Sequence, residues 1–426
     1  MKNSAAGKVF WFVLAVRLLL AGVVSGLPAD STNQKTVGFQ PPKLAQQYGF
    51  VKYGLNKIEA KDSLAMTTFY NALHALQNGT RRKVNIVHIG DSHIQADIFS
   101  GRMRTLLQET DAFENGGRGF VFPYPLARTN NPWNYKVTST GIWSGCKNVQ
   151  YAQNCNWGLA GITAETSDSS ATFSIQNNSV PVSKVRIFYP VKDLTQFSVS
   201  LKASDIIYQP VRTDTLGFAE FILSAEVTEV QVLLQKTFTR QKHFTLQGIS
   251  LENERPGLVY SSLGVNGAEV VSFLRSNVAF ENNLAALNPD LIIISLGTND
   301  AYGKNFNPET FKQNYGTLIQ RIKKAAPQAS VLFTTPGDNY RHRKYPNYSN
   351  VKATAKLYEL AEETGCAVWN FYHVMGGLRS VVKWQLNGLA AKDKVHLTGK
   401  GYRLQGDLLF DAMMNDYLNF SKKAGI

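Results

Sequence analysis

Cysteine is scarce in this sequence, which holds three cysteines in 426 residues. No cluster of cysteine and histidine has the spacing of metal ligands, so we expect no metal site. No organic cofactor is expected either. Cys146 and Cys155 lie nine positions apart in a loop rich in Gly, Asn and Trp, where an exported protein could close a small disulfide. Cys366 lies in the apolar run CAVWNF, which predicts a buried free thiol.

Long apolar runs are missing beyond the first thirty residues. Lys2 and Lys8 precede an apolar stretch over residues 9–24 and small residues follow it, which is the layout of a secretory signal peptide over residues 1–29. Arg17 interrupts the stretch, and about 20 unbroken apolar residues are needed to span a bilayer. We therefore expect a cleaved signal, no stable membrane span, and export to the periplasm or out of the cell. No cysteine follows the stretch closely, which excludes the bacterial lipoprotein route.

Acidic residues are fewer than basic ones, with 31 Asp and Glu against 45 Lys and Arg and a net charge of +14. Loss of the three basic residues of the signal would leave +11. Such a surface attracts anions. Export favours wall polysaccharide over nucleic acid as the anion. The sequence also has no recognisable nucleic-acid-binding motif. With 44% hydrophobic and 18% charged residues, the composition argues against collagen, a disordered chain and a multi-span membrane protein.

Five short apolar runs each lead through a loop into a helical pattern. They cover residues 84–90, 258–264, 291–297, 331–335 and 367–371. Continuous rather than alternating apolar strands, separated by helices, are typical of a parallel sheet covered on both faces. The clearest helix is predicted from Pro308 to Ala325, where apolar residues recur every three or four positions. Another is predicted from Ser63 to Gln77. The fold class is therefore α/β.

The spacing of these runs exposes an insertion. The first two runs are much further apart than the later ones, and between about residues 130 and 255 the pattern changes to alternating apolar and polar residues. Short half-buried strands broken by proline and glycine are typical of a β-sandwich or jelly roll. We predict a signal peptide at 1–29, a first core segment at 30–129, an all-β module at 130–255 and a second core segment at 256–426.

Four short motifs follow predicted strands or precede the last helix. They are GDSH at 90–93, GVNG at 264–267, GTND at 297–300 and DKVH at 393–396. Functional groups gather at the carboxyl ends of parallel strands, so we expect these motifs to meet. A serine hydroxyl becomes a good nucleophile when a neighbouring base takes its proton, which makes Ser92 the candidate nucleophile and His396 the candidate base, with Asp393 orienting it. The Gly267 N–H and the Asn299 amide are candidate donors to an oxyanion.

Taken together and in this order, the four motifs resemble the blocks that give the SGNH/GDSL hydrolases their name. The resemblance covers residues 84–129 and 256–420. It implies a three-layer α/β/α core of the flavodoxin-like type, with a parallel five-stranded sheet. It also implies a serine esterase in which the backbone N–H of Ser92 joins Gly267 and Asn299 as an oxyanion donor.

Two details of the motifs qualify this resemblance. Gly264 is a rival for Gly267, although the glycine before the helix-starting Ala-Glu fits the family's second block better. His93 replaces the leucine that is common after the serine in GDSL lipases. The sequence looks more like a GDSH subset that includes bacterial peptidoglycan O-acetyl esterases, in which a β-rich carbohydrate-binding-like module is inserted after the first block.

Three further polar residues are candidates for substrate binding. His93 could touch substrate, or it could have a structural role in the first helix. Asp338 ends the fourth predicted strand, where it could contact substrate or cap the loop. Arg341 begins the basic run Arg-His-Arg-Lys beside the expected cleft, and could bind an anion or form part of a solvated face.

Aromatic residues crowd the start of the β-rich segment. They are Trp133, Tyr135, Trp143, Tyr151 and Trp157. Sugar rings stack on such side chains, but packing of the module against the core would explain them equally.

The sequence predicts an exported serine esterase that removes O-acetyl groups from a cell-envelope polysaccharide, with peptidoglycan as the preferred substrate. Three alternatives stay open: an esterase of acetylxylan or another acetylated glycan, a glycan O-acetyltransferase, and a non-catalytic glycan-binding protein. The motifs define ester chemistry and leave the alcohol undefined.

Overall fold

The computed structural model describes residues 41 and 44–425, apart from 111 and 178–180. Gln40–Ile426 forms one compact unit. The predicted signal peptide at 1–29 lies outside the described residues, and export remains a prediction.

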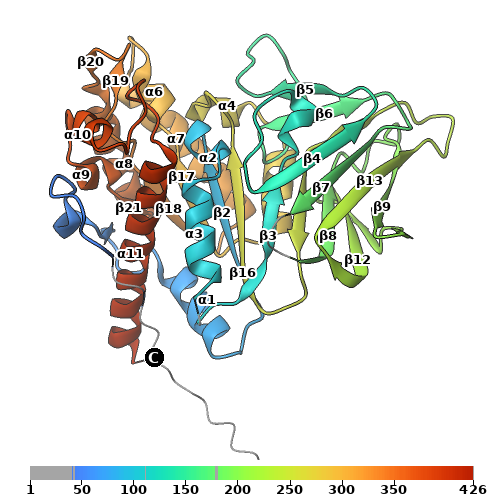
Figure 1. Ribbon diagram of the computed structural model, residues 1–426, viewed down its shortest axis with the longest axis horizontal. Coiled ribbons are helices and arrows are strands. Elements are labelled where there is room, and N and C mark those ends of the chain that lie inside the picture. The colour runs from blue at the N-terminus through green and yellow to red at the C-terminus, as the bar shows by residue number, and fades with distance from the viewer. Residues whose placement is uncertain (1–40, 42–43, 111, 178–180, 426) are drawn as a thin grey trace, which may run out of the picture. The chain divides into compact units, whose positions relative to one another are not determined.

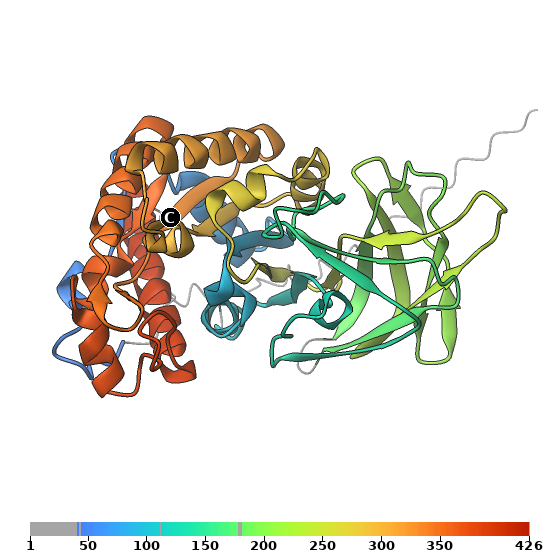
Figure 2. The same cartoon turned by 90° about the horizontal axis from the view of Figure 1, so that it is seen from above.

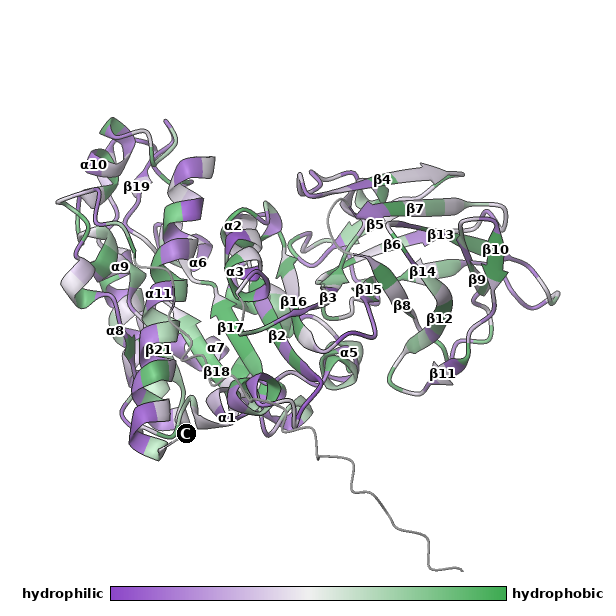
Figure 3. Ribbon diagram, turned by 60° about the horizontal axis from the view of Figure 1, so that its bottom comes forward, coloured by the Kyte–Doolittle hydropathy of each residue, from purple (hydrophilic) through white to green (hydrophobic). Residues whose placement is uncertain are grey.

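A large sheet runs through this unit (Figure 1). All five predicted apolar runs form parallel strands in it, in the spatial order β21-β18-β17-β2-β16. Their bounds are β2 Lys83–Gly90, β16 Gly257–Gly264, β17 Leu291–Ser295, β18 Ser330–Thr334 and β21 Ala367–Trp369. Hydrophobic residues line β2, β17 and β18 (Figure 3), and these strands are almost entirely buried, as continuous apolar runs predict.

The parallel sheet does not stop at five strands. The strand β3 (Asn115–Val121) pairs parallel to β16, so the prediction of five is wrong by one. The sequence of β3 is rich in glycine and lacks an apolar run, which hid it. Gly119 has φ 75°, and a Cβ there would lie 2.7 Å from the Ser261 hydroxyl oxygen, so this position of the strand requires glycine.

Helices cover the sheet on both sides (Figure 2). One layer contains α1 (Thr67–Gln77), α3 (Phe99–Gln108) and α11 (Gly399–Ala424). The other contains α4 (Val270–Leu274), α5 (Ala279–Leu287), α7 (Pro308–Ala325) and α8 (Ser349–Thr364). The bounds of α7 match the prediction. The helix predicted from Ser63 begins at Thr67. These layers give the expected SGNH-type α/β/α core.

The segment in which apolar and polar residues alternate forms strands, as predicted. Some of these strands belong to the same sheet as the core. The strands β15, β8, β12 and β11 extend the sheet antiparallel from β3, and with β1 at the opposite edge the sheet has eleven strands. A five-stranded sheet (β10-β9-β13-β7-β4) and a three-stranded one (β14-β6-β5) complete the segment. The limits at 130 and 255 remain predictions.

The bounds of the strands in and beside this segment are β4 Tyr135–Thr140, β5 Ser144–Lys147, β6 Ile162–Thr166, β7 Thr172–Asn177, β8 Val182–Phe188, β9 Ser198–Ala203, β10 Ile206–Tyr208, β11 Arg212–Asp214, β12 Phe218–Val227, β13 Glu229–Gln235, β14 Phe244–Leu246 and β15 Gly248–Glu252. The remaining short elements are η1 Tyr53–Leu55, β1 Ile58–Glu59, α2 Ser92–Gln95, η2 Tyr124–Ala127, α6 Thr298–Tyr302, β19 Tyr340–Arg341, β20 Tyr345–Pro346, α9 Phe371–Met375 and α10 Ser380–Leu386.

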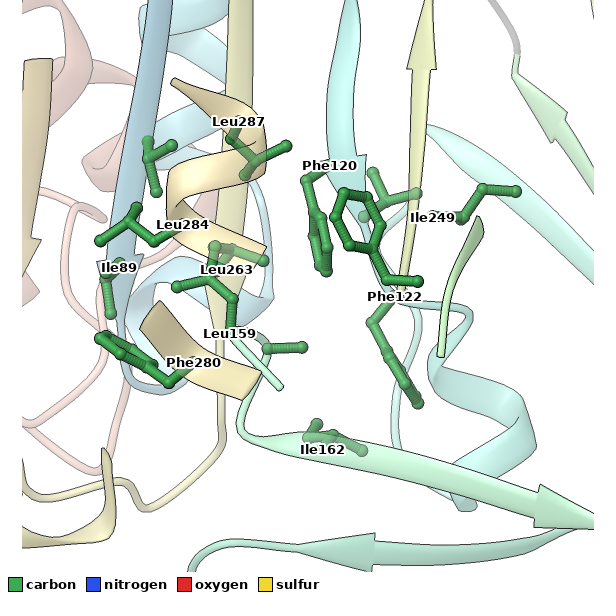
Figure 4. Packing of buried hydrophobic residues seen from close by; sticks show 14 of the residues in the cluster. Ile89, Phe120, Phe122, Leu159, Ile162, Ile249, Leu263, Phe280, Leu284 and Leu287 are labelled. Carbon is green, nitrogen blue, oxygen red and sulfur yellow. The ribbon is translucent and has the colours of Figure 1, made fainter. Parts of the chain in front are cut away.

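Hydrophobic packing also joins the β-rich segment to the core. Phe120 of β3 and Ile249 of β15 lie in one buried cluster with Leu263 of β16 (Figure 4). Leu159 and Ile162, from the β-rich segment, belong to the same cluster. The segment and the core therefore share both a sheet and a hydrophobic core.

The three cysteines lie as the sequence suggests. Cys146 and Cys155 form a disulfide, and Cys366 is a buried free thiol. Within the described part of the chain, no helix is long and apolar enough to cross a membrane, and no cluster of His, Cys, Asp and Glu could hold a metal ion.

Candidate active site

The candidate nucleophile lies at the turn that follows β2. The strand ends at Gly90, and the buried Asp91 caps α2 by accepting a hydrogen bond from the backbone N–H of His93 at 2.9 Å. Ser92 is the first residue of α2 and is half-buried. The turn therefore holds the Ser92 hydroxyl at the carboxyl edge of the sheet, where a substrate can reach it.

His396 and Asp393 come to Ser92 from a loop 300 residues further along the chain. The Ser92 Oγ lies 3.0 Å from His396 Nε2, and His396 Nδ1 lies 2.8 Å from Asp393 Oδ2. The other oxygen of Asp393 accepts the backbone N–H groups of Val395 and His396 at 2.9 and 3.0 Å. This chain of contacts has the geometry by which a base activates a serine hydroxyl and a carboxylate orients the base.

The hydrogen bonds around Asp393 keep it charged. Partial burial alone would raise its pKa, but the hydrogen bonds from the His396 ring and from the two backbone N–H groups outweigh burial and lower the pKa below its usual value. A charged Asp393 stabilises the imidazolium that forms when His396 takes a proton.

The amide of Asn299 connects its own motif to the first motif and to the residue that follows the second. Asn299 lies in α6, directly after β17, and its Nδ2 donates to the Ala268 carbonyl at 3.0 Å and to the Asp91 carboxylate at 3.2 Å. Burial raises the pKa of Asp91. The role of Asn299 as an oxyanion donor remains a prediction.

The two candidate glycines of the second motif lie in different environments. Gly264 is buried at the end of β16, its N–H lies 3.3 Å from the Tyr124 hydroxyl, and a Cβ there would lie 2.1 Å from the Gln95 nitrogen. Gly267 is exposed in a turn with φ 80°. This placement favours Gly267 as the donor, because its N–H is at the surface; its role remains a prediction.

We expect Asn299→Ala to lower kcat/KM for p-nitrophenyl acetate about 10²–10³-fold, because one oxyanion donor is lost. The measurement is steady-state hydrolysis by the variant and the wild type. Asn305→Ala is the matched control, since Asn305 is an exposed asparagine in the same region. Equal kcat/KM for Asn299→Ala and Asn305→Ala would contradict the assignment of Asn299.

His93 lies behind the catalytic ring rather than in the open cleft. Its ring centroid is 5.2 Å from that of His396, and its Nδ1 lies 2.7 Å from the Tyr402 hydroxyl oxygen. Burial lowers the pKa of His93. A neutral His93 does not repel the positive charge that develops on His396, so this placement supports the structural interpretation of His93; a substrate contact remains a prediction.

Asp338 and His93 both line a small cavity of about 30 Å³. Its Oδ2 accepts the backbone N–H of Val381 at 2.9 Å. Burial raises its pKa to about 6, against the opposing effect of backbone hydrogen bonds. Among the described residues, four buried polar atoms of this cavity have no partner: His93 Nε2, Asp338 Oδ1, Asn339 Nδ2 and Gln405 Oε1. Such a polar cavity has room for about two water molecules.

Arg341 holds the loop after α6 in place. One of its guanidinium nitrogens donates to the carbonyls of Ala301 and Gly303 at 2.9 and 2.8 Å and to the Ser349 hydroxyl at 2.9 Å. The structure therefore gives Arg341 a bracing contact, and anion binding by it remains a prediction.

The sequence interpretation missed Gln95, which connects the active-site loops. Its Oε1 accepts the Asn266 N–H at 2.7 Å, and its Nε2 donates to Thr129 and Asn130. Gln95 lies three positions after Ser92 and so on the same face of the helix, which is the signal that could have identified it. The sequence interpretation also missed Tyr402, whose hydroxyl oxygen contacts His93, and no such spacing in the sequence could have identified it.

The fold is an α/β/α sandwich of the SGNH type, and these contacts bring a serine, a histidine and an aspartate together at the carboxyl edge of its sheet. Residues 245–404 match the GDSL-like Lipase/Acylhydrolase family, and this match includes three of the four motifs but not residues 90–93. The chain therefore carries a GDSL-like lipase/acylhydrolase domain and is a hydrolase of ester bonds.

Solved structures resemble this chain to different extents, and the first of the following three shares its fold. A peptidoglycan O-acetylesterase superposes with a TM-score of 0.71 at 23% identity, over 85% of this chain and 99% of that one. A lipase/acylhydrolase from Enterococcus faecalis aligns at 21% identity over 37% of this chain and 77% of its own, with a TM-score of 0.31. An acetyl xylan esterase aligns at 21% identity over 36% of this chain and 80% of its own, with a TM-score of 0.30. No curated protein matches the chain.

Proposed function

We propose that this protein is an exported serine esterase that removes O-acetyl groups from peptidoglycan. The observation that carries the proposal is the continuous set of contacts from the Ser92 hydroxyl through His396 to Asp393. Asn299 donates a hydrogen bond to Asp91, and Asn266, next to Gly267, donates one to Gln95, so both candidate oxyanion donors lie beside residues that flank Ser92.

In the first half of the reaction, His396 Nε2 takes the proton of Ser92 Oγ as the oxygen bonds to the acetyl carbon. The oxyanion that forms accepts hydrogen bonds from Asn299 and from backbone N–H groups. Collapse breaks the bond between the acetyl carbon and the sugar oxygen, and His396 returns the proton to that oxygen. The glycan leaves as an alcohol, and the acetyl group stays on Ser92.

In the second half, a water molecule attacks the acetyl carbon while His396 takes one of its protons. Collapse breaks the bond to Ser92 Oγ, which receives the proton back from His396. Acetate leaves and the enzyme is restored. The reaction uses only groups of this chain, water and substrate.

The likeness to a peptidoglycan O-acetylesterase supports the choice of glycan, because it spans 85% of this chain and so includes much of the β-rich segment. The net charge of +11 that remains after loss of the signal (14 − 3) is also suited to a chain that works among anionic wall polymers. Acetylated xylan and transfer of acetyl to a second sugar would use the same residues.

Acetate release from O-acetylated peptidoglycan and from acetylated xylan tests the proposal. We expect faster release from peptidoglycan by the wild type and none by Ser92→Ala. A preference for xylan would overturn the choice of substrate. Newly acetylated glycan with little free acetate would indicate a transferase instead.

A further inference from the structure

A second polar pocket lies between α3 and the segment that leads into the β-rich region. Its volume is about 140 Å³, well above the 10–15 Å³ or so that one water molecule needs. The lining includes Arg104 and Glu109 near the end of α3, Arg118 of β3, and Trp133 and Asn134. We call it the Arg118 pocket.

Two arginines at this pocket share one carboxylate. Asp97 Oδ2 accepts from Arg104 Nη2 at 2.8 Å and from Arg118 Nη2 at 2.5 Å, and all three side chains are at least 93% buried. Asn134 donates to the same oxygen at 2.6 Å. Two positive charges against one negative charge leave one positive charge uncompensated in a buried cluster, where a second anion would be strongly stabilised.

Unused hydrogen-bonding groups belong to the same residues. Arg118 Nε and Nη1 and Asn134 Oδ1 are buried and have no hydrogen-bond partner in the part of the chain that the structure describes. Burial, together with the nearby charge of Arg104, lowers the pKa of Arg118 to about 10. Buried polar groups normally have partners, so the two nitrogens of Arg118 are unused donors at the edge of the pocket.

Trp133 supplies an exposed aromatic surface at this pocket. Of the five aromatic residues at the start of the β-rich segment, Tyr135, Trp143 and Trp157 are buried and serve packing. Trp133 is 68% exposed. A large exposed indole beside a buried arginine pair offers one surface for the apolar face of a sugar ring and one for a negative group.

The chain that carries Trp133 starts at the rim of the active site. Asn130 accepts hydrogen bonds from Gln95, one helical turn from Ser92, and from Asn266, which precedes Gly267. Residues 129–134 therefore run from the candidate oxyanion loop to the Arg118 pocket. A glycan that follows this segment would place one sugar at Ser92 and another at the pocket.

We propose that the Arg118 pocket binds the carboxylate of an acidic sugar while the sugar ring stacks on Trp133. The proposal rests on the proposed function only in that the acidic sugar would belong to the same glycan as the acetyl ester. Glu109 is exposed at the pocket, and its negative charge repels an anion there and so lowers the affinity.

Titration of the full chain with three sugars tests this site by NMR. The probes are N-acetylmuramic acid and glucuronic acid, which carry free carboxylates, and the neutral N-acetylglucosamine. We expect the acidic sugars to bind about tenfold more tightly than the neutral one, because a carboxylate hydrogen-bonds to charged donors. The tighter of the two acids identifies the source of the carboxylate.

Variants of exposed residues avoid the risk that an Arg118 replacement fails to fold. Trp133→Ala should weaken binding of both acidic sugars about tenfold. Phe238→Ala, the loss of a similarly exposed aromatic side chain outside the pocket, should leave binding unchanged. Glu109→Gln should tighten binding of the acids about two- to threefold and leave the neutral sugar unaffected.

Equal binding of the three sugars, no binding of any, or equal affinities in Trp133→Ala and Phe238→Ala would overturn the proposal. None of the probes carries an ester. Binding without acetate release from peptidoglycan would therefore contradict the proposed function alone, and acetate release without binding would contradict this site alone.

Discussion

Ser92→Ala is expected to abolish ester hydrolysis, with kcat/KM for p-nitrophenyl acetate falling about 10⁶-fold toward the uncatalysed rate. The alanine leaves His396 without a proton to take and removes the oxygen that carries the acetyl group. Only one hydrogen bond of the Ser92 side chain is lost, to His396 Nε2. The fold should therefore be unaffected, and the measurement pairs initial rates with urea unfolding.

Ser170→Ala is the matched control for this variant, because Ser170 is an exposed serine that hydrogen-bonds only to nearby Asp168. It should retain wild-type rates. Turnover by Ser92→Ala at the rate of the wild type would show that Ser92 is not the nucleophile. A loss of activity accompanied by an equal loss of folded protein would assign Ser92 a structural role instead.

Asp97→Asn is expected to lower the free energy of unfolding by about 3–5 kcal/mol, because two buried arginines lose the one carboxylate that pairs with them among the described residues. Asp97 has φ 49° and separates α2 from α3, so its carboxylate also holds the turn between the nucleophile and the helix behind it. Ser100 and Asn134 bind the same carboxylate. Urea denaturation at neutral pH measures the loss.

The difference in unfolding free energy between the wild type and Asp97→Asn should depend on pH, and the contacts of Asp97 set the direction. Burial alone would raise the pKa of Asp97, but Arg104, Arg118 and the hydrogen bond from Asn134 outweigh it and hold the pKa far below its usual value. The stabilisation is therefore complete above the pKa of the unfolded chain, about 4, and is lost as the pH falls toward the folded-state pKa. The gap between wild type and Asp97→Asn should narrow below about pH 4.

Asp168→Asn is the control for Asp97→Asn. Asp168 lies on the surface and its side chain accepts hydrogen bonds only from Ser170, so its replacement should change the unfolding free energy little. Similar stabilities of the two variants would show that the arginines find other partners. That result would also weaken the charge argument for the Arg118 pocket.

Local patterns in the sequence predicted the main elements of the core. The five parallel strands follow from continuous apolar runs, which only a sheet buried on both faces accommodates. The helix Pro308–Ala325 follows from its apolar spacing, and Asn307 caps its start by accepting two backbone N–H groups. The motifs at Ser92 and His396 meet because both lie at the carboxyl edge of the sheet.

Other features depend on contacts between distant residues and carried no local signal. Helix α2 ends before Asp97 and α3 begins after it, and Arg118 and Asn134, 21 and 37 positions further along the chain, bind the Asp97 carboxylate. The strand β3 has no apolar pattern that would predict it. One of its residues, Gly119, must be glycine because the strand approaches Ser261 closely there.

The sequence by itself determined the α/β class, the order of the four motifs and the ester-hydrolase class, because apolar periodicity and reactive residue types are local properties. Tertiary structure alone decided that the β-rich segment continues the core sheet, that Gly267 and not Gly264 is exposed, and that two arginines share Asp97. Each of these depends on which surfaces pack together, and burial, charge compensation and backbone approach are set only once distant segments are in contact.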